Sequence, residues 1–142
     1  MTEQGDIAQK MMEAARNEPY AARMGIECVE VGQGSAVCKM TVAEDMVNLF
    51  GMCHGGAIFS LMDDAFQIAC NSRGLTAYAL NISVTYIGAA KVGQTLVARA
   101  SEKALTNRTG TYELTVTASD DQLIAIAQAI AYSKKEAPQF LA

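Results

Sequence analysis

The sequence lacks an excess of basic residues, since its 11 Lys and Arg residues are outnumbered by 15 Asp and Glu residues. The formal charge is −4 at pH 7, whereas a protein that binds a nucleic acid backbone normally carries the opposite sign. The chain also has no run of about 20 apolar residues, the length of a membrane span, and no basic-then-apolar signal at its start. We therefore expect no nucleic acid partner, no membrane partner and a cytoplasmic location.

Metal-binding and disulfide motifs are also lacking. The four cysteines lie ten, fifteen and seventeen residues apart without a CxxC motif, and the chain has one histidine. This spacing matches no zinc-finger pattern, so no metal site is expected. Reduced thiols that pack as small apolar groups fit the expected cytosolic setting.

Charged residues are scarce, at 18% of the chain against roughly 25% in an average soluble protein. Hydrophobic residues make up 51%, which excludes a disordered chain and favours an oligomer that covers apolar surface. The length of 142 residues fits one domain. We therefore expect a single domain over residues 1–142.

The hydrophobic periodicity predicts two helices and five or six strands. Apolar residues at helical spacing predict an amphipathic N-terminal helix within residues 1–19 and a buried central helix over residues 54–73. Alternation predicts strands on both sides of the turn at Gly32–Gly34, and again in 76–88, 93–105, 109–118 and 122–133. Residues 43–53 show no clean period and are expected to form a loop. The predicted fold class is α+β, with the long helix against an antiparallel sheet.

Two glycines, Gly55 and Gly56, open the central helix, although glycine costs roughly 1 kcal/mol against alanine in a helix interior and somewhat less in the first turn. One explanation is that the backbone packs closely against a neighbour. The other is that free N–H groups of the first turn approach a ligand oxygen, as in an oxyanion hole for acyl transfer. His54, directly before the glycines, fits a structural cap as well as a catalytic role.

Asp63 and Asp64 interrupt the same apolar helix, and buried carboxylates are costly unless they have a use. Successive helical residues point about 100° apart, and the apolar pattern leaves open which of the two points inward. A buried carboxylate could serve as a general base or nucleophile with a raised pKa. Gly55 and Asp63 lie about 12 Å apart along one helix, so a shared site would require Gly55 of one subunit and Asp63 of another.

The segment NLFGMCHGGAIFSLMDDAF, followed by ACNSRG, resembles the hotdog-fold acyl-CoA thioesterases of the phenylacetate-degradation (PaaI-like) group. The resemblance extends from NEPYAARMGIE to the final hairpin. It implies a hotdog fold, in which a five- to six-stranded antiparallel sheet wraps a long central helix, and homodimers that assemble into a homotetramer. It also implies hydrolysis of an aryl-acetyl or medium-chain acyl-CoA to a free acid and CoA, without a cofactor.

Carried over residue by residue, the resemblance implies that Asp63 activates water or attacks the thioester carbonyl. Gly55 would donate its backbone N–H to the carbonyl oxygen, and Asn48 and His54 would orient the thioester or the leaving group. Family members usually place the aspartate and the HGG segment on different subunits.

Further substrate contacts are expected on the strands. Some relatives use a Ser or Thr on the strand after the central helix to hold the attacking water, but the matching position here is Ala79. We therefore predict Asn81 as its substitute, with Ser83 nearby. Tyr86 and Arg108 are predicted to contact CoA, Arg108 because a phosphate group favours a cation.

Two other functions fit parts of the pattern. A hotdog hydratase or dehydratase could pair His54 with Asp63 across a dimer, although the HFPxxP-like sequence of dehydratases is missing. A non-catalytic acyl-CoA-binding module would need the pocket but not Asp63.

Overall fold

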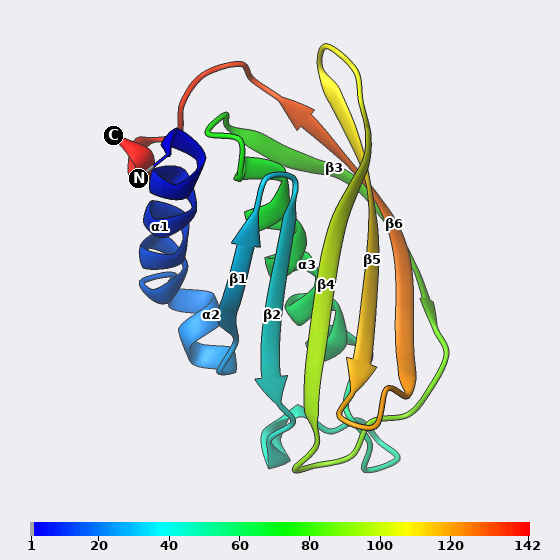
Figure 1. The fold of residues 1–142 in the computed structure, drawn as a ribbon. Helices are drawn as coiled ribbons and strands as arrows, with labels where there is room; N and C mark the ends of the chain where they lie inside the picture. Colours follow the sequence, from blue (N-terminus) through cyan, green and yellow to red (C-terminus); the bar gives the residue numbers. More distant parts are fainter. Residues whose placement is uncertain (1) are drawn as a thin grey trace.

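The computed structural model describes residues 2–142, and Figure 1 shows a curved sheet around one long helix. The helices and strands follow one another in the order α1 Glu3–Arg16, α2 Pro19–Met24, β1 Glu27–Gly32, β2 Ser35–Thr41, α3 Gly55–Asn71, β3 Ala77–Tyr86, β4 Thr95–Leu105, β5 Thr109–Ala118 and β6 Leu123–Ser133. Short 3-10 turns occur at Glu44–Met46 and Gln139–Leu141.

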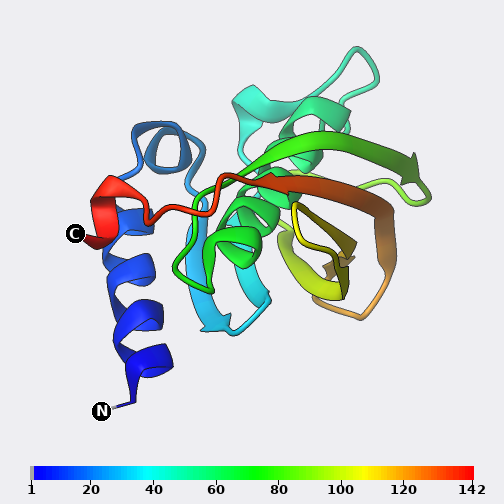
Figure 2. The same ribbon diagram turned by 90° about the horizontal axis from the view of Figure 1, so that it is seen from above.

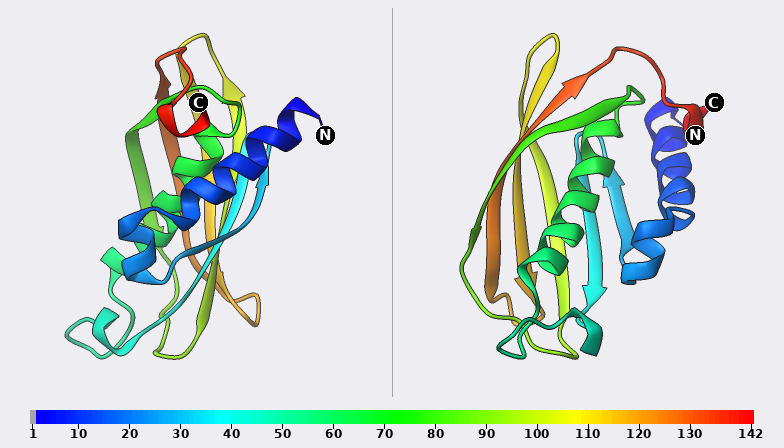
Figure 3. Two further views of the ribbon diagram at one scale, coloured as in Figure 1. Left: turned by 90° about the vertical axis from the view of Figure 1, so that its left-hand side faces the viewer. Right: turned by 180° about the vertical axis from the view of Figure 1, so that it is seen from behind.

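The six strands form one antiparallel sheet in the order β1-β2-β4-β5-β6-β3. The sheet curves so that its inner face surrounds α3, which Figure 2 and the right-hand view of Figure 3 show most directly. The predicted α+β class, the hairpin of β1 and β2 and the hairpin of β5 and β6 are confirmed.

The core lies between α3 and the inner face of the sheet. Large α3 side chains such as Leu61 and Phe66 are fully buried there, and the Phe66 ring meets the Tyr112 ring edge to face at 5.3 Å between centroids. Four buried alanines of β6 leave room for these side chains: Ala125, Ala127, Ala129 and Ala131. Apolar residues on most sides of α3 therefore reflect a helix that the sheet wraps.

The N-terminal region contains one helix more than predicted. The helix predicted to extend to residue 19 ends at Arg16, with Asn17 as its C-cap, and Pro19 begins α2. Proline disfavours helical backbone in the residue before it but fits the first position of a new helix. Met1, which the predicted helix includes, lies outside the described residues.

Strand β3 forms one edge of the sheet. The turn that precedes α3 protrudes beyond this edge, as seen in Figure 2 and in the left-hand view of Figure 3. Within residues 2–142, none of the helices combines the length and the apolar character needed to cross a membrane.

Candidate active site

The start of α3 presents one backbone donor without an acceptor. The Nδ1 atom of His54 accepts a hydrogen bond from the Gly56 N–H at 2.8 Å, and the His54 carbonyl accepts from the Ala57 N–H at 3.0 Å. Among the described residues, the Gly55 N–H has no hydrogen-bond acceptor. This N–H lies at the positive end of the helix dipole, where developing negative charge is stabilised.

The cap also defines the imidazole of His54. Because Nδ1 accepts the Gly56 N–H, the proton of the neutral ring must lie on Nε2. His54 is exposed, so its Nε2–H can donate to a bound ligand. The capping role and the ligand-binding role therefore use different nitrogens of the same ring.

Tyr86, at the end of β3, contacts the carbonyl side of the Gly55 peptide. Its hydroxyl donates to the Gly55 carbonyl at 3.0 Å, and a Cβ on residue 55 would lie 3.3 Å from the Tyr86 ring. The packing at residue 55 is tight, since the Tyr86 ring would have to shift by a few tenths of an ångström to admit a Cβ, and it leaves the N–H open. Of the two explanations for this glycine, the structure shows the packing directly and is compatible with the oxyanion role.

Asn48 shapes the turn before α3. Its side-chain oxygen accepts the N–H groups of Phe50 and Met52 at 2.9 and 3.1 Å, and its own N–H donates to the Met52 carbonyl at 2.7 Å. Gly51 completes the turn with a φ of +77°, a conformation that favours glycine. The Asn48 oxygen is therefore occupied, and only its NH₂ group remains for a ligand.

The structure resolves which aspartate points inward. Asp64 is 7% exposed, and its carboxyl group accepts hydrogen bonds from the Gln67 amide at 3.4 Å and from the Cys38 thiol at 3.9 Å. Asp63 is only partly buried. Asp63 is therefore the carboxylate that a substrate can reach.

Burial raises the pKa of both aspartates. It raises the pKa of Asp64 to about 8, together with hydrogen bonding to the Glu18 carboxyl group. The pKa of Asp63 is also raised, first by burial and then by the charge of Glu18. Glu18, at the start of α2, therefore lies close to both carboxyl groups and favours their protonated forms.

We expect Asp64 to make the protein less stable as the pH rises. Its carboxyl group keeps a proton in the folded state that the unfolded chain has already released above its ordinary pKa of 3.8. Because only the folded state holds this proton between about pH 4 and about pH 8, the free energy of unfolding falls by about 1.4 kcal/mol for each unit of rising pH. Asp64→Asn should flatten this slope in urea unfolding measured at several pH values. Asp6→Asn, at an exposed position, should leave the slope unchanged, and an equal change in both variants would contradict the assignment.

Two predicted substrate contacts lie on the far side of the sheet. A β-bulge at Leu80 makes Ala79 oppose the buried Ala131, while Asn81 opposes Ile130 on the other face. Ser83 opposes Gln128 and shares this outer face with Asn81. Within one subunit, neither Asn81 nor Ser83 is brought together with Asp63.

Arg108 also lies apart from the start of α3. It occupies the turn between β4 and β5, where its guanidinium donates to the Tyr132 hydroxyl at 3.4 Å. Figure 1 places this turn at the end of the sheet opposite to the beginning of α3. Of the predicted substrate contacts on the strands, only Tyr86 adjoins Gly55.

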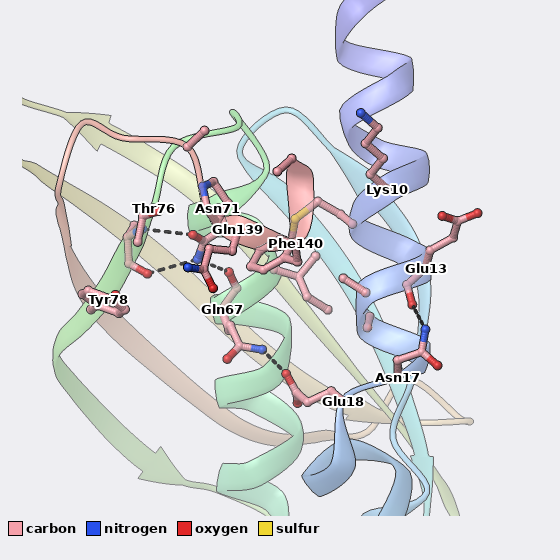
Figure 4. A pocket seen from close by; sticks show the side chains of 18 of the residues that line it. Lys10, Glu13, Asn17, Glu18, Gln67, Asn71, Thr76, Tyr78, Gln139 and Phe140 are labelled. Carbon is pink, nitrogen blue, oxygen red and sulfur yellow. Dashed lines mark hydrogen bonds between the residues drawn. The ribbon is translucent and has the colours of Figure 1, made fainter.

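A cavity of about 920 Å³ lies beside the C-terminal half of α3 and was not predicted (Figure 4). Its walls come from α1, α3, the start of β3 and the C-terminal tail, including Met11, Gln67, Asn71, Tyr78 and Phe140. Gln67 lies one helical turn after Asp63 and therefore shares a face of α3 with it. No group of three potential metal ligands occurs among residues 2–142.

Residues 50–125 match the thioesterase superfamily. Acyl-coenzyme A thioesterase PaaI of Escherichia coli is 36% identical over 110 residues, which cover 78% of this chain and 79% of that protein. Human acyl-coenzyme A thioesterase 13 is 33% identical over 91 residues, which cover 62% of this chain and 64% of that protein.

The fold is similar to solved structures of related proteins. The E. coli PaaI protein from the phenylacetic acid degradation operon superimposes with a TM-score of 0.91 and 29% identity, over 96% of this chain and 99% of that chain. The smu.793 protein of Streptococcus mutans, bound to acetyl CoA, superimposes with a TM-score of 0.76 and 26% identity, over 80% of this chain and 91% of that chain.

Proposed function

This chain belongs to the thioesterase superfamily and is a PaaI-like acyl-CoA thioesterase with the hotdog fold, and we propose that two copies of it build each active site together. One observation carries the proposal. The open Gly55 N–H and the accessible Asp63 carboxyl group lie on one helix, about 12 Å apart along its axis. A base must come within about 3 Å of the group on which it acts, so the two groups need different subunits to meet at one carbonyl.

In the proposed site, the Gly55 N–H of one subunit donates to the thioester carbonyl oxygen and stabilises the negative charge that develops there. Asp63 of the other subunit takes a proton from the attacking water, or attacks the carbonyl carbon itself. In either case the carbon–sulfur bond breaks and CoA leaves as its thiolate. When water attacks, the free acid forms directly. When Asp63 attacks, the acyl group is held by Asp63 as an anhydride, which water then hydrolyses to the free acid and the regenerated carboxylate. The chemistry requires a carboxylate and fixed dipoles, because a thioester is already activated.

His54 and Asn48 orient the thioester in this proposal. The Nε2–H of His54 and the NH₂ group of Asn48 are the donors that remain after each side chain has made its local hydrogen bonds. Tyr86 acts through Gly55, since its hydroxyl fixes the peptide that offers the N–H. Asn81, Ser83 and Arg108 are not part of this proposal.

The finer features of the function rest on the relatives. The acyl group that we propose is aryl-acetyl or medium-chain, in keeping with the origin of the E. coli protein in the phenylacetic acid degradation operon. We also propose a homodimer that assembles into a homotetramer, and a cytoplasmic location. The exposed edge of β3, beside the start of α3, offers a surface on which the second copy can pair.

Release of free CoA thiol from a panel of acyl-CoAs tests the activity. We expect thiol in proportion to enzyme, with phenylacetyl-CoA or octanoyl-CoA preferred over acetyl-CoA. A hydratase would change the absorbance of an enoyl-CoA without releasing thiol, and a binding module would do neither. Either of those results would contradict the proposed hydrolysis.

A further inference from the structure

The two most exposed large apolar side chains among the described residues are neighbours at the tip of the turn before α3. Leu49 is 100% exposed and Phe50 is 81% exposed. Asn48 and Gly51 hold this tip in a defined turn, and an isolated bridge between Val47 and Cys53 closes its base. The exposure is therefore built into the fold, and contact with other apolar groups would remove this surface from water.

The tip points away from its own subunit. It protrudes beyond β3, at the edge where the proposed second copy is expected (Figures 2 and 3). Exposures of 100% for Leu49 and 81% for Phe50 leave both side chains largely without contacts in their own subunit, and neither lines the 920 Å³ cavity. The apolar surface that packs against Leu49 and Phe50 must therefore belong to another molecule.

The shared site predicts where the tip reaches. If Gly55 of the second copy lies beside Asp63, the two α3 helices run antiparallel. The residues before Gly55 of the second copy then continue along α3 towards its C-terminal end. Gln67 and Asn71 follow Asp63 along this direction at about 6 Å and about 12 Å, and both line the 920 Å³ cavity.

The cavity has the chemistry of an acyl site and not of a phosphate site. Apolar groups such as Met11, Ile68, Tyr78 and Phe140 form much of its wall, while its charged lining consists of three glutamates and one lysine: Glu13, Glu18, Glu136 and Lys10. An excess of carboxylates repels the phosphates of CoA. The volume lies within the range of small-molecule sites, about 300–1,000 Å³. Figure 4 shows the hydrogen bond between Gln67 and Glu18 in the wall of the cavity, and Gln67 follows Asp63 by one turn of α3.

We propose that Leu49 and Phe50 of one subunit form a wall of the acyl-binding cavity of the other subunit and so determine which acyl groups are accepted. This inference rests on the proposed shared site. The cavity takes a bulky apolar acyl group, aromatic or medium-chain, between Tyr78 and Phe140 of one copy and the tip of the second copy. An acetyl group is too short to reach it.

A double variant, Leu49→Ala with Phe50→Ala, tests the selectivity. We expect kcat/KM for phenylacetyl-CoA or octanoyl-CoA to fall at least about 10-fold, while kcat/KM for acetyl-CoA stays within about 2-fold. Leu105→Ala removes an apolar side chain that is half exposed at the end of β4, and it should change neither value. An equal loss for all acyl groups would assign the tip a role in shaping the turn, and no loss for any would also overturn the inference.

A cross-linking experiment tests the contact without turnover. Phe50→Cys and Gln139→Cys chains, co-assembled and treated with a short bismaleimide, should give a covalent dimer that neither single variant nor the parent chain gives. The parent controls for its own cysteines, of which Cys28 is the most exposed. Absence of the cross-link overturns the inference even if the enzyme hydrolyses acyl-CoA. If the wild type releases no thiol, the proposed function fails separately.

Discussion

Asp63→Asn is expected to lower kcat by about 100- to 10,000-fold and to leave the affinity for acyl-CoA nearly unchanged. Asparagine keeps the shape of the side chain but can neither take a proton from water nor attack the carbonyl as a carboxylate does. Thiol release measures kcat, and calorimetric titration with a non-hydrolysable acyl-CoA analogue measures affinity. Near-normal turnover in this variant would exclude the assigned role.

Asp64→Asn provides the matched control, since the two carboxylates are adjacent on α3 and burial raises the pKa of both. Asp64 is turned inward onto Cys38 and Gln67, where a substrate cannot touch it. We expect its replacement to change kcat far less than Asp63→Asn does. A larger loss in Asp64→Asn would show that the wrong carboxylate has been assigned.

The direction of the pKa shift also fixes the pH dependence expected for Asp63. Hydrolysis requires the ionised carboxylate, whether it acts as base or nucleophile. Burial and the charge of Glu18 raise the pKa of Asp63. As the pH is lowered, kcat/KM should therefore begin to fall at a pH above the range in which carboxyl groups ordinarily become protonated. A raised pKa also makes the carboxylate a stronger base near neutral pH.

The hydrophobic periodicity of the sequence was sufficient to predict the central helix, the strands and the turns between them. It could do so because the spacing of apolar residues in a helix or strand follows which of its side chains are buried. Residues 54–73 were predicted as the helix and Gly55–Asn71 form it, with His54 as N-cap. Helix α2 was not predicted. Its six residues are too few for a helical period, and Pro19 signals the end of one helix as readily as the start of the next.

The sequence was less able to predict which side chains face the candidate site, because a single inserted residue can reverse the direction in which its neighbours point. Alternation places Ala79 and Asn81 on one face of β3, and the bulge at Leu80 separates them. Likewise, the apolar pattern of α3 could not decide between Asp63 and Asp64, because the choice depends on contacts with Cys38 from β2 and with Glu18, the N-cap of α2. Such contacts join segments that are distant in the chain.

Gly55→Pro should lower kcat by about 100- to 1,000-fold, the loss found when one oxyanion donor is removed. Proline has no backbone N–H, yet it is well tolerated at the first helical position, which residue 55 occupies after the N-cap His54. His54 already has extended backbone, with a ψ of 138°, as a residue before proline requires. The far-ultraviolet circular dichroism and the melting temperature should therefore stay close to those of the wild type.

Gly55→Ala is the control, because it adds the same Cβ against the Tyr86 ring, 3.3 Å away, and keeps the N–H. It should retain most of the kcat, and an equal loss in both variants would assign the effect to crowding.

Mixed dimers then decide whether the site is shared. A dimer of one Gly55→Pro chain and one Asp63→Asn chain contains one site with both groups intact, so random pairing of two inactive variants should restore about a quarter of the wild-type kcat. If both groups acted within one subunit, the mixture would remain as inactive as its parents.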